Sequence, residues 1–89
     1  MIVREDMVIR NHCGLHARVA TGLAAIAQSN NVEIQLVSGG RSADCCSILE
    51  VLSLALTRDS HVEVLIRGKD ADKSLDAVRE LLTGTEFDG

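Results

Sequence analysis

Aromatic and basic residues are scarce in this chain of 89 residues. Its one aromatic residue is Phe87, and 9 Lys and Arg stand against 13 Asp and Glu, which gives a formal net charge of −4. Proteins that bind nucleic acids use basic side chains to contact phosphates and aromatic rings to stack on bases. The sequence therefore argues against a nucleic acid partner.

Long apolar runs and paired cysteines are also lacking. No apolar run approaches the roughly 20 residues of a transmembrane helix, and no charged-then-apolar leader precedes a small-residue cleavage site. The three cysteines, Cys13, Cys45 and Cys46, cannot all pair, and adjacent cysteines form a strained bridge. We therefore expect reduced thiols, no membrane insertion and a cytoplasmic location.

Four segments have the pattern of β-strands. Apolar and charged residues mix over Met1–Arg10, and Val32–Leu36 alternates strictly between apolar and polar residues. A turn at residues 38–40 (Ser-Gly-Gly) predicts a short returning strand over Arg41–Asp44. The fourth predicted strand is His61–Arg67.

Three segments have the helical period. The first helix is expected from Ala17 to about Ser29, and the second from an N-cap at Ser47 to about Leu56. The third begins near Asp70 or Asp72 and ends before Gly84. The predicted core stripes are Ala20, Leu23, Ala24 and Ala27 in the first helix, Ile48, Val51, Leu52 and Ala55 in the second, and Ala71, Leu75, Val78 and Leu82 in the third.

The second helix carries three further expectations. Ser47 and Glu50 have the spacing of a capping box, in which the Glu50 side chain reaches back to the Ser47 N–H. Leu49 and Leu56 lie beside the core stripe and are expected to be partly exposed. The pair Cys45–Cys46 is expected to be partly buried beneath this helix.

The order of elements predicts the fold class. Strands and helices follow one another as β-α-β-β-α-β-α, with no internal repeat and no linker. We therefore expect one α+β domain over residues 1–89, an open-faced sandwich in which a four-stranded antiparallel sheet carries three helices on one face.

The junction between the first strand and the first helix has the chemistry of an anion site. N–H groups in the first turn of a helix have no intrahelical partner, and the helix dipole adds positive charge there. His16 would lie at this point, where the dipole disfavours the imidazolium, and a neutral ring nitrogen is a nucleophile able to carry a phosphoryl group. Arg18 adds a permanent positive charge for the phosphoryl oxygens.

From Val8 to Leu82 the chain resembles the histidine-containing phosphocarrier family, HPr and its paralogues, of the bacterial phosphoenolpyruvate-dependent phosphotransferase system. Residues 14–18 (Gly-Leu-His-Ala-Arg) are similar to the family's phosphorylation motif, and residues 47–49 (Ser-Ile-Leu) are similar to its regulatory-serine segment. The interval of 31 residues between the histidine and the serine is usual in the family.

The resemblance implies a carrier without cofactor or metal rather than an enzyme. His16 would take a phosphoryl group on Nδ1, the pros nitrogen, from phosphorylated enzyme I and pass it to an enzyme IIA domain in sugar uptake or its regulation. Arg18 would stabilise the phosphoryl charge, and Ser47 would be a regulatory phosphorylation site. The implied phosphoryl-binding residues are Ala17 and Cys13, and the implied partner surface is Thr21, Ile48, Leu49 and Leu52. A serine kinase or phosphorylase and a transcriptional regulator are further implied partners of what we expect to be a monomer.

Several positions depart from the family pattern. Val19 stands where proline is common, and Cys13 stands where the family usually has a small polar residue. Ala25, Gln28 and Glu50 stand beside the site where many sugar-type carriers have lysines. The less basic docking face keeps the nitrogen-type regulatory branch open as an alternative.

Two other classes of protein also stay open. One is a binding regulator with the same fold that acts through Ser47 and the second helix, although relatives of that kind tend to have lost the histidine that this chain keeps. The other is a metal or redox module built on His12, Cys13 and His16. Metal sites usually need three or four ligands and no C-x-x-C spacing is present, so this last hypothesis is the weakest.

Overall fold

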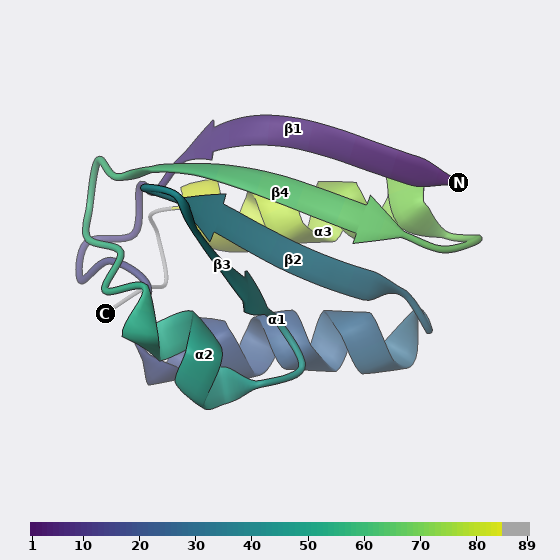
Figure 1. Ribbon diagram of the computed structural model, residues 1–89, viewed down its shortest axis with the longest axis horizontal. Helices are drawn as coiled ribbons and strands as arrows, with labels where there is room; N and C mark the ends of the chain where they lie inside the picture. The colour runs from purple at the N-terminus through teal and green to yellow at the C-terminus, as the bar shows by residue number, and fades with distance from the viewer. Residues whose placement is uncertain (85–89) are drawn as a thin grey trace.

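The computed structural model describes residues 1–84 and contains four strands and three helices (Figure 1). In chain order they are β1 (Ile2–Val8), α1 (Ala17–Ser29), β2 (Glu33–Ser38), β3 (Arg41–Asp44), α2 (Ile48–Ser53), β4 (His61–Arg67) and α3 (Ala71–Thr83). This is the predicted order β-α-β-β-α-β-α. The single-domain prediction includes residues 85–89, which lie outside the described part, and it stays a prediction.

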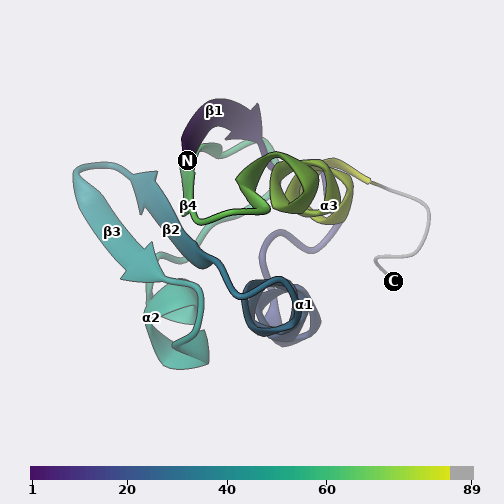
Figure 2. The same ribbon diagram turned by 90° about the vertical axis from the view of Figure 1, so that its right-hand side faces the viewer.

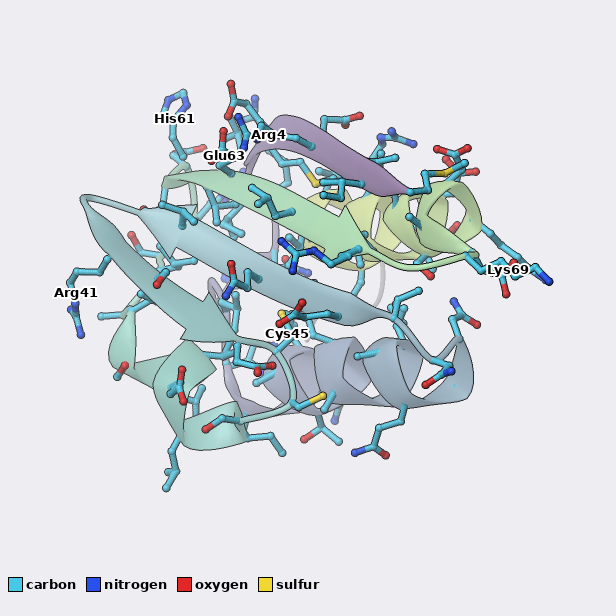
Figure 3. All side chains as sticks on the ribbon, turned by 45° about the vertical axis from the view of Figure 1, so that its right-hand side comes forward. Arg4, Arg41, Cys45, His61, Glu63 and Lys69 are labelled. Carbon is cyan, nitrogen blue, oxygen red and sulfur yellow. The ribbon has the colours of Figure 1, made fainter. Side chains whose placement is uncertain are left out.

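The strands form one antiparallel sheet in the order β1-β4-β2-β3. β4 lies between β1 and β2 and pairs with both, so β1 and β2 are joined only after the later strand β4 has folded between them. All three helices cover the same face of the sheet (Figure 2). On the opposite face, Arg4, Glu63 and His61 project away from the helices (Figure 3). The predicted α+β open-faced sandwich is confirmed.

Alternating residues of the two central strands supply the sheet side of the core. Ile34 and Leu36 of β2, together with Val64 and Ile66 of β4, are fully buried. The helices face them with small and branched residues whose spacing matches the predicted stripes of α1 and α3. These are Ala20, Leu23, Ala24, Ala27, Ala71, Val78 and Leu82, whereas Leu75, also predicted in the α3 stripe, is only partly buried.

α2 begins after Ser47 as predicted, but its C-terminal end and its buried face differ from the prediction. It ends at Ser53 rather than near Leu56, because the N–H groups of Leu54 and Ala55 bond to carbonyls only three residues back and Ala55 has a φ of +53°. This turn brings Leu56 into the core at 7% exposure and leaves Ala55 at the surface, so both predictions were wrong. Ile48, also predicted in the core stripe, is 37% exposed.

The two adjacent cysteines have different environments. The N–H of Cys45 donates to Ile34 O and extends the sheet ladder, which places the Cys45 side chain in the core between the sheet and the helices (Figure 3). Cys46 follows in a turn where its N–H donates to Asp44 Oδ1, and its side chain is exposed. The predicted burial is therefore confirmed for Cys45 and wrong for Cys46. Burial raises the pKa of the Cys45 thiol to about 12.

We expect native protein to show two fast-reacting thiols and one protected thiol. Cys13 and Cys46 are exposed and should react with a thiol reagent, whereas Cys45 is buried and kept as the unreactive thiol by its raised pKa. The measurement is the number of thiols labelled before and after unfolding. Cys46→Ser is the control and should leave one fast thiol. Rapid labelling of Cys45 in folded protein would contradict its burial.

An ion pair joins the edge strand β1 to α3. The Arg79 guanidinium donates to both carboxylate oxygens of Glu5 at 2.9 and 2.6 Å, and its Nη1 donates to Asp76 at 2.9 Å. These hydrogen bonds hold the pKa of the Glu5 carboxyl below its ordinary value of 4.5. The stabilisation is therefore complete above that value and is lost as the pH falls through the lowered pKa of the folded protein.

Glu5→Gln should lower the free energy of unfolding at neutral pH, and the difference from wild type should shrink as the pH falls below 4.5. Denaturant unfolding over a pH series measures this. Glu33→Gln is the control, because the Glu33 carboxylate lies 3.6 Å from Arg67 in an exposed pair. A Glu5→Gln difference that stays constant through the acid range would show that this pair is not linked to stability.

Candidate functional site

Two backbone hydrogen bonds fix the part of the β1–α1 loop that leads into His16. The Gly14 N–H donates to Asn11 O at 3.0 Å, which closes a tight turn, and the Leu15 N–H donates to Leu56 O at 2.9 Å. Gly14 has a φ of +73°, and a Cβ at this position would lie 2.6 Å from Leu56 O. Only glycine fits both constraints. The loop before α1 is thereby fixed against the segment that links α2 to β4.

His16 occupies the N-cap position of α1. Its backbone is extended, and its carbonyl accepts from the Ala20 N–H at 3.0 Å. The imidazole makes no capping hydrogen bond and the first turn holds no acidic residue. Within residues 1–84, no acceptor is bonded to the N–H groups of Ala17 and Arg18, which follow His16. These groups and the helix dipole favour an anion beside the imidazole.

The imidazole of His16 is half-buried and its two nitrogens differ. Nε2 is buried and has no hydrogen-bond partner among the described residues. The same holds for Oδ1 of Asn11, a residue that is 4% exposed. The Asn11 amide nitrogen donates to Leu81 O at 3.0 Å and to Gly84 O at 3.4 Å, so this loop is also tied to the end of α3.

His16 and Asn11 line a cleft of about 480 Å³ between α1 and α3. Gly22 permits the close approach of the two helices, because a Cβ there would lie 2.9 Å from Leu81 Cδ2. The cleft is mostly apolar, and Arg18 and Glu80 are the charged residues on its described lining. Its full described lining is Asn11, His16, Arg18, Val19, Gly22, Ile26, Ala77, Glu80, Leu81 and Gly84.

The predicted phosphoryl-binding residues surround the start of α1. Cys13, Ala17 and Arg18 are exposed. Arg18 forms no ion pair with any residue of the described part, so its guanidinium is available to an external anion. Thr21 is exposed one turn further on, where its hydroxyl donates to Ala17 O at 2.8 Å.

α2 packs beside the beginning of α1 (Figure 1), which brings the rest of the predicted surface near His16. Leu49 is 81% exposed and Ile48 is 37% exposed, whereas Leu52 is half-buried. The second helix therefore presents two adjacent apolar side chains to solvent at its first turn.

Ser47 caps α2 as predicted, and its Oγ accepts from the Glu50 N–H at 3.3 Å. The other half of the predicted capping box is wrong. The Ser47 N–H donates to Asp44 O, and Glu50 Oε1 instead accepts from the Asp44 N–H at 3.1 Å. The turn after β3 supplies its own partner for Ser47, so the Glu50 carboxylate satisfies a donor further back.

The metal hypothesis gains no support from the arrangement of side chains. Residues 1–84 hold no group of three or more His, Cys, Asp or Glu placed to bind one ion. Nor does this part of the chain contain a helix with the length and apolar character needed to cross a membrane.

Asn11 was not predicted as a site residue. In the sequence it is one polar residue of a loop, and its partners Leu81 and Gly84 lie 70 and 73 residues away. No local pattern could have shown that its side chain is buried beside His16.

Comparisons with known proteins identify the family of the chain. Residues 3–84 match the family described as the PTS HPr component phosphorylation site. Phosphocarrier protein NPr from Shewanella violacea is 38% identical over 80 residues, which cover 90% of this chain and 88% of that protein. Phosphocarrier protein HPr from Mycoplasma pneumoniae is 30% identical over 78 residues, which cover 86% of this chain and 89% of that protein.

The fold agrees as well. The crystal structure of a phosphocarrier protein HPr from Bacillus anthracis superimposes with a TM-score of 0.84 at 25% sequence identity, covering 91% of this chain and 96% of that chain. The match over residues 3–84 includes the whole loop and helix start described above. The chain therefore belongs to the HPr family, whose members are phosphocarrier proteins of the phosphotransferase system.

Proposed function

We propose that His16 accepts a phosphoryl group from phosphorylated enzyme I and passes it to an enzyme IIA domain in the cytoplasm. The observation that carries this proposal is the position of His16 at the open N-terminus of α1 with its Nε2 enclosed by protein. Because Nε2 is buried, Nδ1 is the ring nitrogen that a partner can reach. This agrees with the pros nitrogen that the family resemblance implies.

The surrounding groups suit a transferred phosphoryl group. In the reaction the Nδ1 lone pair forms a bond to phosphorus, and the bond between phosphorus and the donor nitrogen breaks with its electron pair staying on the donor. The phosphoryl oxygens are then stabilised by the free N–H groups at Ala17 and Arg18 and by the Arg18 guanidinium. Cys13 adds a thiol, which is a weak donor. In transfer to the acceptor, a nucleophile of the acceptor forms a bond to phosphorus, and the bond between phosphorus and Nδ1 breaks with its electron pair returning to Nδ1.

The partner surface in this proposal is the exposed start of α1 and α2. Leu49 and Ile48 provide an apolar contact, and Thr21 and Leu52 lie beside it on the two helices. Protein interfaces commonly place apolar residues at the centre and polar residues at the rim. Enzyme I and enzyme IIA would bind this surface in turn, because each must reach the same nitrogen.

A nitrogen-type regulatory carrier is the second candidate. Arg18 and Glu50 are the charged residues of α1 and α2, so the docking face has no lysine. Lys69, at the beginning of the segment that leads into α3, lies at the other end of the molecule from the start of α1 (Figure 3). The identity with NPr, 38%, also exceeds the identity with the mycoplasma HPr, 30%. Both candidates use His16 in the same way.

Ser47 has a structural role whether or not it is modified. Its hydroxyl caps α2, which is worth about 1 kcal/mol in typical helices, and a phosphate there would lie near the Glu50 carboxylate. Regulatory phosphorylation of Ser47, with a serine kinase or a transcriptional regulator as partner, stays a prediction.

Incubation with phosphoenolpyruvate and enzyme I should add one phosphoryl group that is lost in acid and survives in alkali, because the acceptor is a nitrogen. His16→Ala should abolish labelling. The matched control is His12→Ala, which removes an exposed histidine four residues away and should label normally. Acid-stable label, or full labelling of His16→Ala, would overturn the proposal.

Arg18→Ala should slow phosphoryl transfer without unfolding the protein. An exposed arginine without an ion pair should change stability by no more than about 0.5 kcal/mol, whereas a charge-assisted hydrogen bond lost in transfer costs about 1.5–3 kcal/mol. Thermal unfolding and transfer rates measure the two effects. Arg58→Ala, another exposed arginine, should transfer at the wild-type rate. Equal rates for Arg18→Ala and wild type would exclude the proposed role.

A further inference from the structure

Two residues that line the same cleft each carry a buried polar atom without a partner. The atoms are Oδ1 of Asn11 and Nε2 of His16, and neither bonds to any residue of the described part. Buried polar groups are almost always hydrogen-bonded, because an unpaired one keeps the full cost of leaving water. One atom is an obligate acceptor and the other is a nitrogen that can carry a proton, so the pair is complementary.

The orientation of the Asn11 amide is fixed by its other contacts. Leu81 O and Gly84 O are carbonyl oxygens and can only accept, so the atom that faces them must be the amide nitrogen. The turn in which Asn11 O accepts from Gly14 N–H fixes the backbone as well. Oδ1 therefore remains a buried acceptor beside the cleft, with no donor bonded to it among the described residues.

We propose that Asn11 is a positioning residue for His16. The two atoms are not bonded to each other in this structure, so Oδ1 accepts from Nε2–H through one bridging water molecule or after a small rotation of the two side chains, and either form has the same effect. The neutral ring then keeps its proton on Nε2 and its lone pair on Nδ1. This inference rests on the proposed function, because it explains how Nδ1 is kept ready to react.

The hydrogen bond from Nε2–H to Oδ1 persists throughout phosphoryl transfer. When Nδ1 bonds to phosphorus, the ring gains positive charge and Nε2–H becomes a stronger donor to Oδ1. When the bond between phosphorus and Nδ1 breaks, its electron pair returns to Nδ1 and the Nε2 proton has not moved. Asn11 thus contacts neither the phosphoryl group nor the partner, and it acts only through the ring.

The test is the tautomer of His16, read from the ring ¹⁵N chemical shifts by NMR at a pH where the imidazole is neutral. In wild type we expect a protonated Nε2 and an unprotonated Nδ1. Asn11→Ala removes both the acceptor and the contacts to α3, and it should give shifts that indicate a mixture of tautomers. Asn11→Asp also loses the donor to α3 but keeps an acceptor oxygen, and it should restore the wild-type tautomer.

Glu80→Gln is the matched control, because Glu80 is the carboxylate that lines the same cleft. It should leave the tautomer unchanged. Loss of one hydrogen bond should slow transfer in Asn11→Ala by roughly three- to tenfold, while Asn11→Asp should transfer faster than Asn11→Ala at matched stability. A purely structural role for Asn11 would make the two variants alike in both measurements.

Two results would overturn the inference. One is a protonated Nδ1 in the wild-type protein, and the other is an unchanged tautomer in Asn11→Ala. The NMR measurement uses unphosphorylated protein, so it can succeed or fail independently of transfer. If wild-type protein accepted no phosphoryl group but kept the expected tautomer, the proposed function would fail and the contact between Asn11 and His16 would stand.

Discussion

The close approach of Gly14 to Leu56 is the constraint on which the site depends. The Leu15 N–H donates to Leu56 O and joins the end of the loop before α1 to the loop after α2, and Ile9 makes two further backbone hydrogen bonds between the same loops. Because Gly14 has no side chain, the backbones of the two loops can approach each other closely. The same contact therefore sets where α1 begins, and with it the position of His16.

This contact also shapes the surface beside His16. The segment after α2 can reach Leu15 because α2 ends after six residues and the positive φ of Ala55 turns Leu56 inward. In the first turn of the same helix Leu49 and Ile48 remain at the surface. The phosphoryl site and the apolar surface proposed for its partners thus arise from one arrangement of two loops.

Local patterns were enough to predict most of the fold and the central histidine. The alternation over Val32–Leu36 and the helical period of α1 and α3 reflect burial against one sheet, and His16 lies where a strand pattern gives way to a helical one. The sequence-based predictions were wrong where contacts between distant parts of the chain determine the local structure. The end of α2 depends on Leu15, the separation of Cys45 from Cys46 depends on the sheet edge, and the burial of Asn11 depends on carbonyls at the other end of the chain.

The span of the Asn11 contacts has a consequence for the life of the protein in the cell. The side chain of Asn11 bonds to Leu81 and Gly84, which lie 70 and 73 positions further along the chain. The loop around His16 is therefore complete only when both ends of the described chain have folded together. A nascent or nicked chain that lacks α3 would have the histidine but not the enclosed imidazole. The burial of the His16 ring nitrogen Nε2 therefore depends on contacts between distant parts of the described chain and not on the loop alone.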